Sequence, residues 1–210
     1  MRLRTRLALA FAVLSIVPLS LVVPVALRDL RRTLSTELDT HVQVASNAAE
    51  TVLDRTRADV RRSVEELSES VALEDVAKEI HQGGGSRTAT AGERLMKSRG
   101  LTVLSLFDKK GITLSSGHLP ARLGDPDEAL FAVTRRTDRE TVPVLVEIRD
   151  EKGLRKVPAL VTARDMDYGE VKIWVVGGVL LDASLASHLS SLTGARVEID
   201  NPDSTLVASS

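Results

Sequence analysis

The chain has 210 residues, no cysteine and a formal net charge of -1 at pH 7. Disulfides and thiolate metal sites are therefore excluded, and the charge gives no electrostatic footprint for nucleic acid. Aromatic residues make up 2% of the chain, so its core has to be built from valine, leucine, alanine and isoleucine. Stacking platforms for bases or sugars are not expected. The length allows one domain with a real core and the start of another.

An uncharged apolar run extends from Leu7 to Leu27. As a helix it is long enough to cross the ~30 Å hydrocarbon core of a membrane. A cleaved signal peptide is the alternative, because arginines precede the run, but signal cores are usually only about 7–15 residues long. We interpret residues 7–27 as a transmembrane helix in the inner (cell) membrane. Residues 1–6 are then cytoplasmic, and everything after residue 27 is extracytoplasmic.

Residues 28–82 have helical composition, and glycine first appears at Gly83. Apolar side chains recur at helical spacing, which predicts one long amphipathic helix or two nearly collinear ones. Such a helix can transmit movement to the membrane and can pair with a second copy in a homodimer. Its stripe can also simply pack on the domain that follows. The residues expected to face a dimer partner are Leu34, Leu38, Ala45 and Val52.

A linker and a short helix are predicted over residues 83–100, where the spacing of Thr90 and Glu93 is typical of a capping box. The hydrophobic period then changes to two. Residues 101–181 are expected to form five strands, with a short helix capped within 124–127 and ending near Arg135. The expected strands are 101–107, 112–116, 142–148, 157–163 and 171–175. The predicted fold class is α+β, an antiparallel sheet with helices packed on one side.

The last segment, residues 182–210, repeats part of this pattern. Asp182 can cap a helix that Gly194 ends, and a second hairpin follows. The letters VEIDNPDSTLVASS are loosely similar to SLFDKKGITLSS, with a strand, an aspartate, a turn, a strand and two serines. We expect a second, truncated PAS-like unit to begin here.

The chain resembles the extracytoplasmic Cache-type (PAS-like) sensor regions of bacterial membrane histidine kinases and chemoreceptors. The resemblance rests on the anchor joined to a long helix, on LFDKKGITLSSGHLPARLGDPD with its Asp-x-x-Gly hairpin, and on GVLLD ahead of a helix. It implies a PAS-like five-stranded sheet and the sensor module of a two-component histidine kinase. The parent protein would then bind ATP and Mg²⁺ in its kinase module and act on a response regulator.

Two other interpretations stay open. The same module occurs on chemoreceptors and cyclic-dinucleotide enzymes, and an anchored envelope protein that does not signal would also fit. No catalytic residues are found in the chain, since no nucleophile lies in a recognisable elbow or triad pattern. The four histidines, on separate predicted elements, do not predict a metal site. Asp165-Met166-Asp167-Tyr168-Gly169 lacks the glycine and glutamate of a calcium loop and is expected to be a hairpin turn.

A ligand pocket is the remaining expectation. In the family that the chain resembles, this pocket lies between the sheet and its short helix. Arginines there would suit a small carboxylate ligand through paired donors. Ordinary surface charges at strand and helix ends are the alternative for each residue. The candidate ligand-binding residues are Ser116, His118, Arg135, Arg136, Arg164 and Asp165.

Overall fold

A computed structural model describes residues 41–83, 86–136, 140–151, 153–169, 171–194, 196–201 and 204–209. The chain forms two compact units, Met1–Ala48 and Ala49–Ser210, and the sheet and its covering helices lie in the second. The predicted anchor, with Leu34 and Leu38, lies outside the described residues. Among the helices that are described, none is long and apolar enough to cross a membrane.

The described part of residues 28–82 contains two helices rather than one continuous helix. Residues 41–68 are helical, and α2 follows at Val71–His81. Ser70 separates them, because its hydroxyl donates to the carbonyl of Leu67 (2.7 Å) and accepts from the amide of Leu73 (3.3 Å). One serine hydroxyl thus supplies a hydrogen-bond partner to a carbonyl in the last turn of the first helix and to an amide in the first turn of the second.

The predicted apolar stripe is visible in the burial of the N-terminal helix (residues 41–68). Val60, Val64 and Leu67 are fully buried, whereas Ala45 and Val52 are half-buried. The part of the stripe near the sheet therefore packs on its own domain, which is the alternative to pairing with a second copy. The role of Ala45 and Val52 in a dimer stays a prediction.

The third helix, α3 (Ser86–Ser98), begins four residues before the predicted capping box, so that box is wrong as a helix start. Gly92 lies inside the helix, where a Cβ would stand 2.4 Å from the hydroxyl of Ser115. A Cβ on Gly117 would likewise stand 2.7 Å from the carbonyl oxygen of Gly92. The glycines therefore let α3 lie against β2 at backbone distance.

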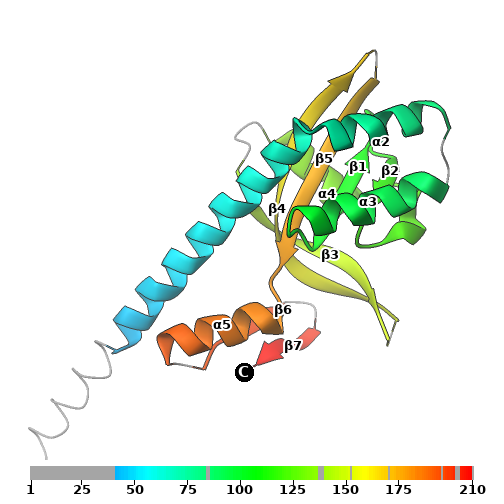
Figure 1. Cartoon of the computed structure of the whole chain (residues 1–210). Helices are drawn as coiled ribbons and strands as arrows, with labels where there is room; N and C mark the ends of the chain where they lie inside the picture. Colours follow the sequence, from blue (N-terminus) through cyan, green and yellow to red (C-terminus); the bar gives the residue numbers. More distant parts are fainter. Residues whose placement is uncertain are drawn as a thin grey trace, which may run out of the picture. The chain divides into compact units, whose positions relative to one another are not determined.

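Five antiparallel strands form one sheet in the order β2-β1-β5-β4-β3 (Figure 1). This confirms the predicted PAS-like strand content, although β4 and β5 are longer than the sequence pattern indicated. Asp108 accepts hydrogen bonds from the amides of Lys110 and Ile112 in the first hairpin turn, as the Asp-x-x-Gly pattern predicted. The strand bounds are β1 Val103–Phe107, β2 Thr113–Ser116, β3 Val142–Asp150, β4 Gly153–Tyr168 and β5 Val171–Leu180.

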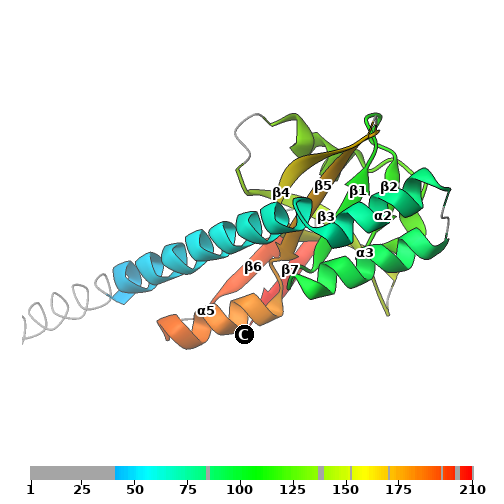
Figure 2. The same ribbon diagram turned by 45° about the horizontal axis from the view of Figure 1, so that its top comes forward.

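Helices cover both faces of the sheet, so the expectation of helices on one side is wrong. The N-terminal helix, α2 and α3 cover what we call the long-helix face, seen in Figures 1 and 2. The core of this face includes Val64, Leu67, Leu73, Leu95, Leu101, Leu104, Leu106, Ile173 and Val175.

The opposite side, which we call the short-helix face, packs against α4 (Glu128–Phe131) and the 3-10 turn η2 (Ala132–Arg135). Asp127 caps α4 by accepting from the amide of Leu130 (3.2 Å), and η2 ends at Arg135, as predicted. Another 3-10 turn, η1 (Pro120–Arg122), comes before α4. The core of this face includes Val103, Phe107, Leu130, Val133, Val142, Val146, Ala159, Val161, Ala163 and Val176.

The C-terminal elements match their predicted positions. Asp182 accepts from the amides of Ser184 and Leu185 at the start of α5 (Ala183–Thr193), and Gly194 ends the helix with a φ of 66°. The strands β6 (Glu198–Asn201) and β7 (Ser204–Ser209) then pair as an antiparallel hairpin. Whether they begin a second sensor unit stays a prediction.

Candidate functional site

The six candidate ligand residues do not lie together in the fold. Arg164 is opposite Val175 in the strand register, on the long-helix face, whereas the next residue, Asp165, is opposite Trp174 on the other face. Adjacent residues of a strand point to opposite faces. A single small ligand therefore cannot contact all six residues.

Two candidates do come together. The His118 Nδ1 atom lies 3.1 Å from the carbonyl oxygen of Leu104 and 3.3 Å from the hydroxyl of Ser116. Ser116 is buried, and its hydroxyl accepts from the amide of Leu119 at 3.2 Å. The segment that leaves β2 is thus tied to β1 by one imidazole and one hydroxyl.

The other candidates lie apart. The exposed Arg135 places its guanidinium carbon 5.8 Å from the centre of the Phe131 ring, a cation–π contact, and Arg136 is exposed after η2. Asp165 forms a 2.7 Å ion pair with Lys172, whose ammonium group lies 5.1 Å from the ring centre of Trp174. Asp165 to Tyr168 continue β4 in register with β5, so of this segment only Gly169 lies in the predicted hairpin turn.

Arg164 is a buried charge beneath the N-terminal helix. Its side chain is 8% exposed, its Nη1 donates to the carbonyl of Ala163 at 2.9 Å, and its Nε lies 4.0 Å from a carboxylate oxygen of Glu65. Glu65 is 55% exposed, so solvent screens this attraction. The pair nevertheless joins a charge on the sheet to the helix that covers it.

Next to His118, Ser116 and Leu104, which we call the His118 corner, lies an ion-pair network that the sequence did not reveal. Arg122 pairs with Asp127, the cap of α4, at 2.5 Å and also with Glu147 on β3. The network joins η1, α4 and the β3–β4 hairpin. A helix cap was predicted within residues 124–127, but Arg122 and Glu147 are far apart in the sequence and no spacing rule connects them.

The environment of His118 lowers the pKa of its imidazole below the ordinary value of about 6.5. Burial is the main cause, because it disfavours the charged ring. The hydrogen bond to the backbone of Leu104 and the negative charge of Asp127 act in the opposite direction, and Arg122 lowers the pKa further. The imidazole is accordingly neutral at pH 7.

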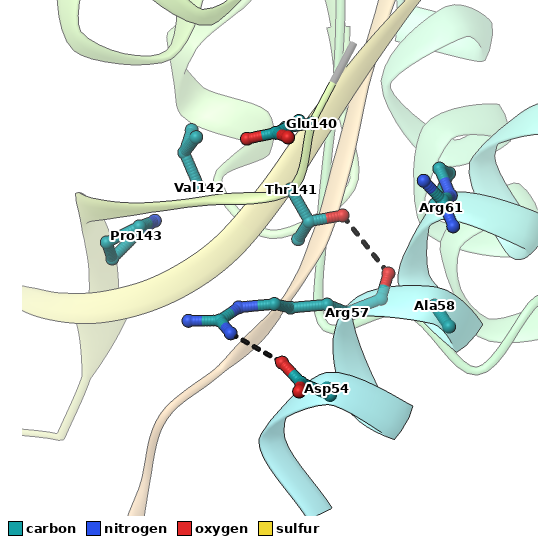
Figure 3. A pocket seen from close by; sticks show the side chains of 8 residues that line it. All are labelled: Asp54, Arg57, Ala58, Arg61, Glu140, Thr141, Val142 and Pro143. Atoms are coloured by element: carbon teal, nitrogen blue, oxygen red, sulfur yellow. Dashed lines mark hydrogen bonds and ion pairs between the residues drawn. The ribbon is translucent and has the colours of Figure 1, made fainter. Parts of the chain in front are cut away.

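A pocket of about 580 Å³ lies between the N-terminal helix and the start of β3 (Figure 3). This volume is within the usual range of small-ligand sites, about 300–1,000 Å³. Arg57 forms a 2.7 Å ion pair with Asp54 inside the pocket, and the hydroxyl of Thr141 donates to the Arg57 carbonyl at 3.1 Å. The lining residues are Asp54, Arg57, Ala58, Arg61, Glu140, Thr141, Val142 and Pro143.

Sequence reasoning missed this pocket, since its two walls are separated by about 80 residues of chain. Arg57 and Arg61 are one helical turn apart and therefore share a face of the helix, which is a pattern a sequence can show. Charged residues four apart are typical of any exposed helix, so this pattern alone does not indicate a site. The partner wall could be found only from the fold.

No family model matches the sequence, and no curated protein matches it either. Solved structures do resemble it in fold. Two structures of the periplasmic domain of Vibrio cholerae LuxQ give TM-scores of 0.55 and 0.56, with 15% and 16% sequence identity. The alignments cover 80% of this chain in each case, and 78% and 77% of the LuxQ chains.

A third structure is a weaker match. The sensory domain of the Campylobacter jejuni chemoreceptor Tlp3, with isoleucine bound, gives a TM-score of 0.46 at 11% identity and covers 83% of this chain and 71% of its own. The predicted resemblance to Cache-type sensor regions is thus confirmed as a resemblance of fold, on the LuxQ structures.

Proposed function

We propose that this chain is the extracytoplasmic sensor module of a membrane-anchored signalling protein. The fold shared with a periplasmic domain and the apolar N-terminal run support this proposal. A two-component histidine kinase, with ATP and Mg²⁺ in its kinase module and a response regulator as partner, is the parent that the sequence resemblance favours. A chemoreceptor or a cyclic-dinucleotide enzyme is the alternative.

One observation carries the proposal: the N-terminal helix packs directly on the central strand of the sheet. A Cβ on Gly177 of β5 would lie 2.6 Å from a methyl carbon of Val64 and 3.1 Å from Leu101. Only glycine leaves room for the helix at this distance. A change in the shape of β5 would therefore move the helix that leads toward the predicted anchor.

The pocket of Figure 3 is the place where a small ligand would act on this contact most directly. One wall is the N-terminal helix and the other is the edge strand β3, so a bound molecule would bridge the two. Arg57 is already paired with Asp54, whereas Arg61 forms no hydrogen bond or ion pair within the described part of the chain. Guanidinium groups suit a carboxylate through paired donors, so a small carboxylate is the proposed ligand class.

The test is a thermal-unfolding screen of the full chain in detergent with a panel of small carboxylates. A ligand that binds the folded state raises the melting temperature by mass action. Arg61→Ala should abolish the shift. Arg62→Ala is the matched control, because Arg62 is also exposed but does not line the pocket.

The variants Arg135→Ala and Arg164→Ala test the ligand site that was expected from the sequence, as Arg61→Ala tests the pocket of Figure 3. Loss of the shift in either variant, with Arg61→Ala unaffected, would move the ligand away from the helix pocket. If no compound raises the melting temperature of the wild type or of any variant, the alternative of an anchored envelope protein that does not signal would be favoured.

A further inference from the structure

We propose that the His118 corner is an acid-sensitive latch, which holds the segment between β2 and α4 on β1 at neutral pH and releases it when the imidazole takes up a proton. The inference concerns residues 116–127, none of which lines the pocket of Figure 3. It does not depend on the identity of any ligand.

The contacts of the ring favour one of its two nitrogens as the atom that would receive the proton. The Nδ1 atom of His118 lies 3.1 Å from the Leu104 carbonyl oxygen, to which an N–H at Nδ1 would donate, and 3.4 Å from the Leu104 amide, from which a bare Nδ1 would accept. The shorter contact favours Nδ1 as the donor, which leaves Nε2 as the basic atom. In the described part of the chain, Nε2 is buried and has no hydrogen-bond partner.

Protonation would therefore create a buried N–H and a positive charge with no acceptor aligned to receive them. Such a group is costly unless it is paired. The charged groups that face the ring are Arg122 from η1 and Asp127 from the cap of α4. Each oxygen of Asp127 already holds a contact, one to Arg122 at 2.5 Å and the other to the amide of Leu130, and neither is hydrogen-bonded to Nε2 of His118.

Loss of the His118 contacts would affect the segment that follows β2. The amide of Gly117 donates to the Leu104 carbonyl at 2.9 Å, the same oxygen that His118 uses. Leu119, whose amide bonds to Ser116, is buried at 4% exposure. Movement of the ring thus weakens the β1–β2 edge and also the anchoring of η1, which carries Arg122.

The direction of the pH effect follows from linkage. The pKa of His118 in the folded state lies below its unfolded value of about 6.5, so the unfolded chain binds the proton more readily. The stabilisation by neutral His118 is complete above about pH 6.5 and is lost as the pH falls through the window between the two pKa values. Acid should therefore open the latch.

The test compares the full-length protein with His118→Asn, which keeps an N–H donor near the Nδ1 position but does not titrate. Hydrogen exchange at the amides of Leu104, Gly117 and Leu119 should accelerate in the wild type between about pH 7 and pH 5, beyond the intrinsic change in exchange rate. His118→Asn should show no such excess. Asparagine at His41, His81 or His188, which are exposed, should leave the wild-type behaviour unchanged.

NMR titration of the His118 imidazole in the wild-type protein needs no variant and covers the case in which His118→Asn fails to fold. A ring pKa below that of the exposed histidines, together with the excess exchange, would support the latch. A ring that titrates at or above about pH 6.5, or an equal excess in His118→Asn, would overturn it.

Discussion

The two faces of the sheet differ in how they hold their helices. On the long-helix face, a glycine of β5 admits the N-terminal helix to backbone distance, and the core is almost entirely aliphatic. On the short-helix face, two short helical turns pack around Phe107 and Phe131, whose ring centres are 5.7 Å apart. A titratable corner with an ion-pair network stands beside the edge of the sheet. The two faces thus differ in packing: a glycine brings one long helix close to the central strand, and aromatic rings hold two short turns on the other side.

The largest effects should come from cavities in either core. Phe107→Ala and Leu67→Ala remove fully buried side chains and should lower the free energy of unfolding by about 3–5 and 2–5 kcal/mol. The single tryptophan, Trp174, packs on the short-helix face and separates the two cases. Native-state fluorescence should change in Phe107→Ala but stay as in the wild type in Leu67→Ala. An equal change in both variants would mean that the faces are not independent.

Overpacking the helix contact should have the next largest effect. Gly177→Ala places a methyl group against Val64 and Leu101 and should cost about 1–3 kcal/mol of stability. Val64→Ala in the same chain opens room for that methyl, so the double variant should be more stable than the sum of the single losses predicts, by about 0.5–3 kcal/mol. Denaturant unfolding of the four proteins measures this coupling. Simple additivity would show that the helix does not bear on β5 at this point.

A smaller effect is expected from the charges beneath the helix. Arg164→Ala removes a buried stem and its hydrogen bond and should cost about 1–3 kcal/mol. Glu65→Gln should cost less than about 1 kcal/mol, because that carboxylate is mostly exposed and 4.0 Å away. Denaturant unfolding of both variants checks the order. If Glu65→Gln were the more damaging change, the ion pair would outweigh the packing of Arg164.

The smallest effect on stability, and the one that concerns assembly, belongs to the far end of the same helix. The chain has no cysteine, so single cysteines can be placed one at a time. Ala45→Cys and Val52→Cys should crosslink between copies in membranes, since disulfides need Cα atoms within about 7 Å. Gln43→Cys and Asn47→Cys should not. Equally low crosslinking at all four positions would remove the dimer from the account.

Local signals in the sequence predicted local structure well. Alternating valines, the aspartate caps of α4 and α5 and the glycines that end helices each act within a few residues, so the strand order along the chain and α5 were predicted correctly. Contacts between distant segments were not predictable. Gly92 was read as part of a helix start because its true neighbour, Ser115, is joined to it only by packing.

The candidate site shows the same limit. Ser116 and His118 are two residues apart and do lie in contact, whereas the grouping of Arg164 with Asp165 ignored that neighbours on a strand face opposite ways. Arg122 and Glu147, or Arg57 and Thr141, meet only through the fold. Pairing rules for a single element give no information about such contacts.

The most direct test of the central claim, an extracytoplasmic sensor behind an N-terminal anchor, is cysteine labelling in intact cells. Leu154 is 60% exposed on the β3–β4 hairpin, so Leu154→Cys presents an accessible thiol. A small membrane-impermeant maleimide should label this variant without permeabilisation, and Thr5→Cys, on the predicted cytoplasmic side, only after it. Labelling of Leu154→Cys only after permeabilisation would contradict the account.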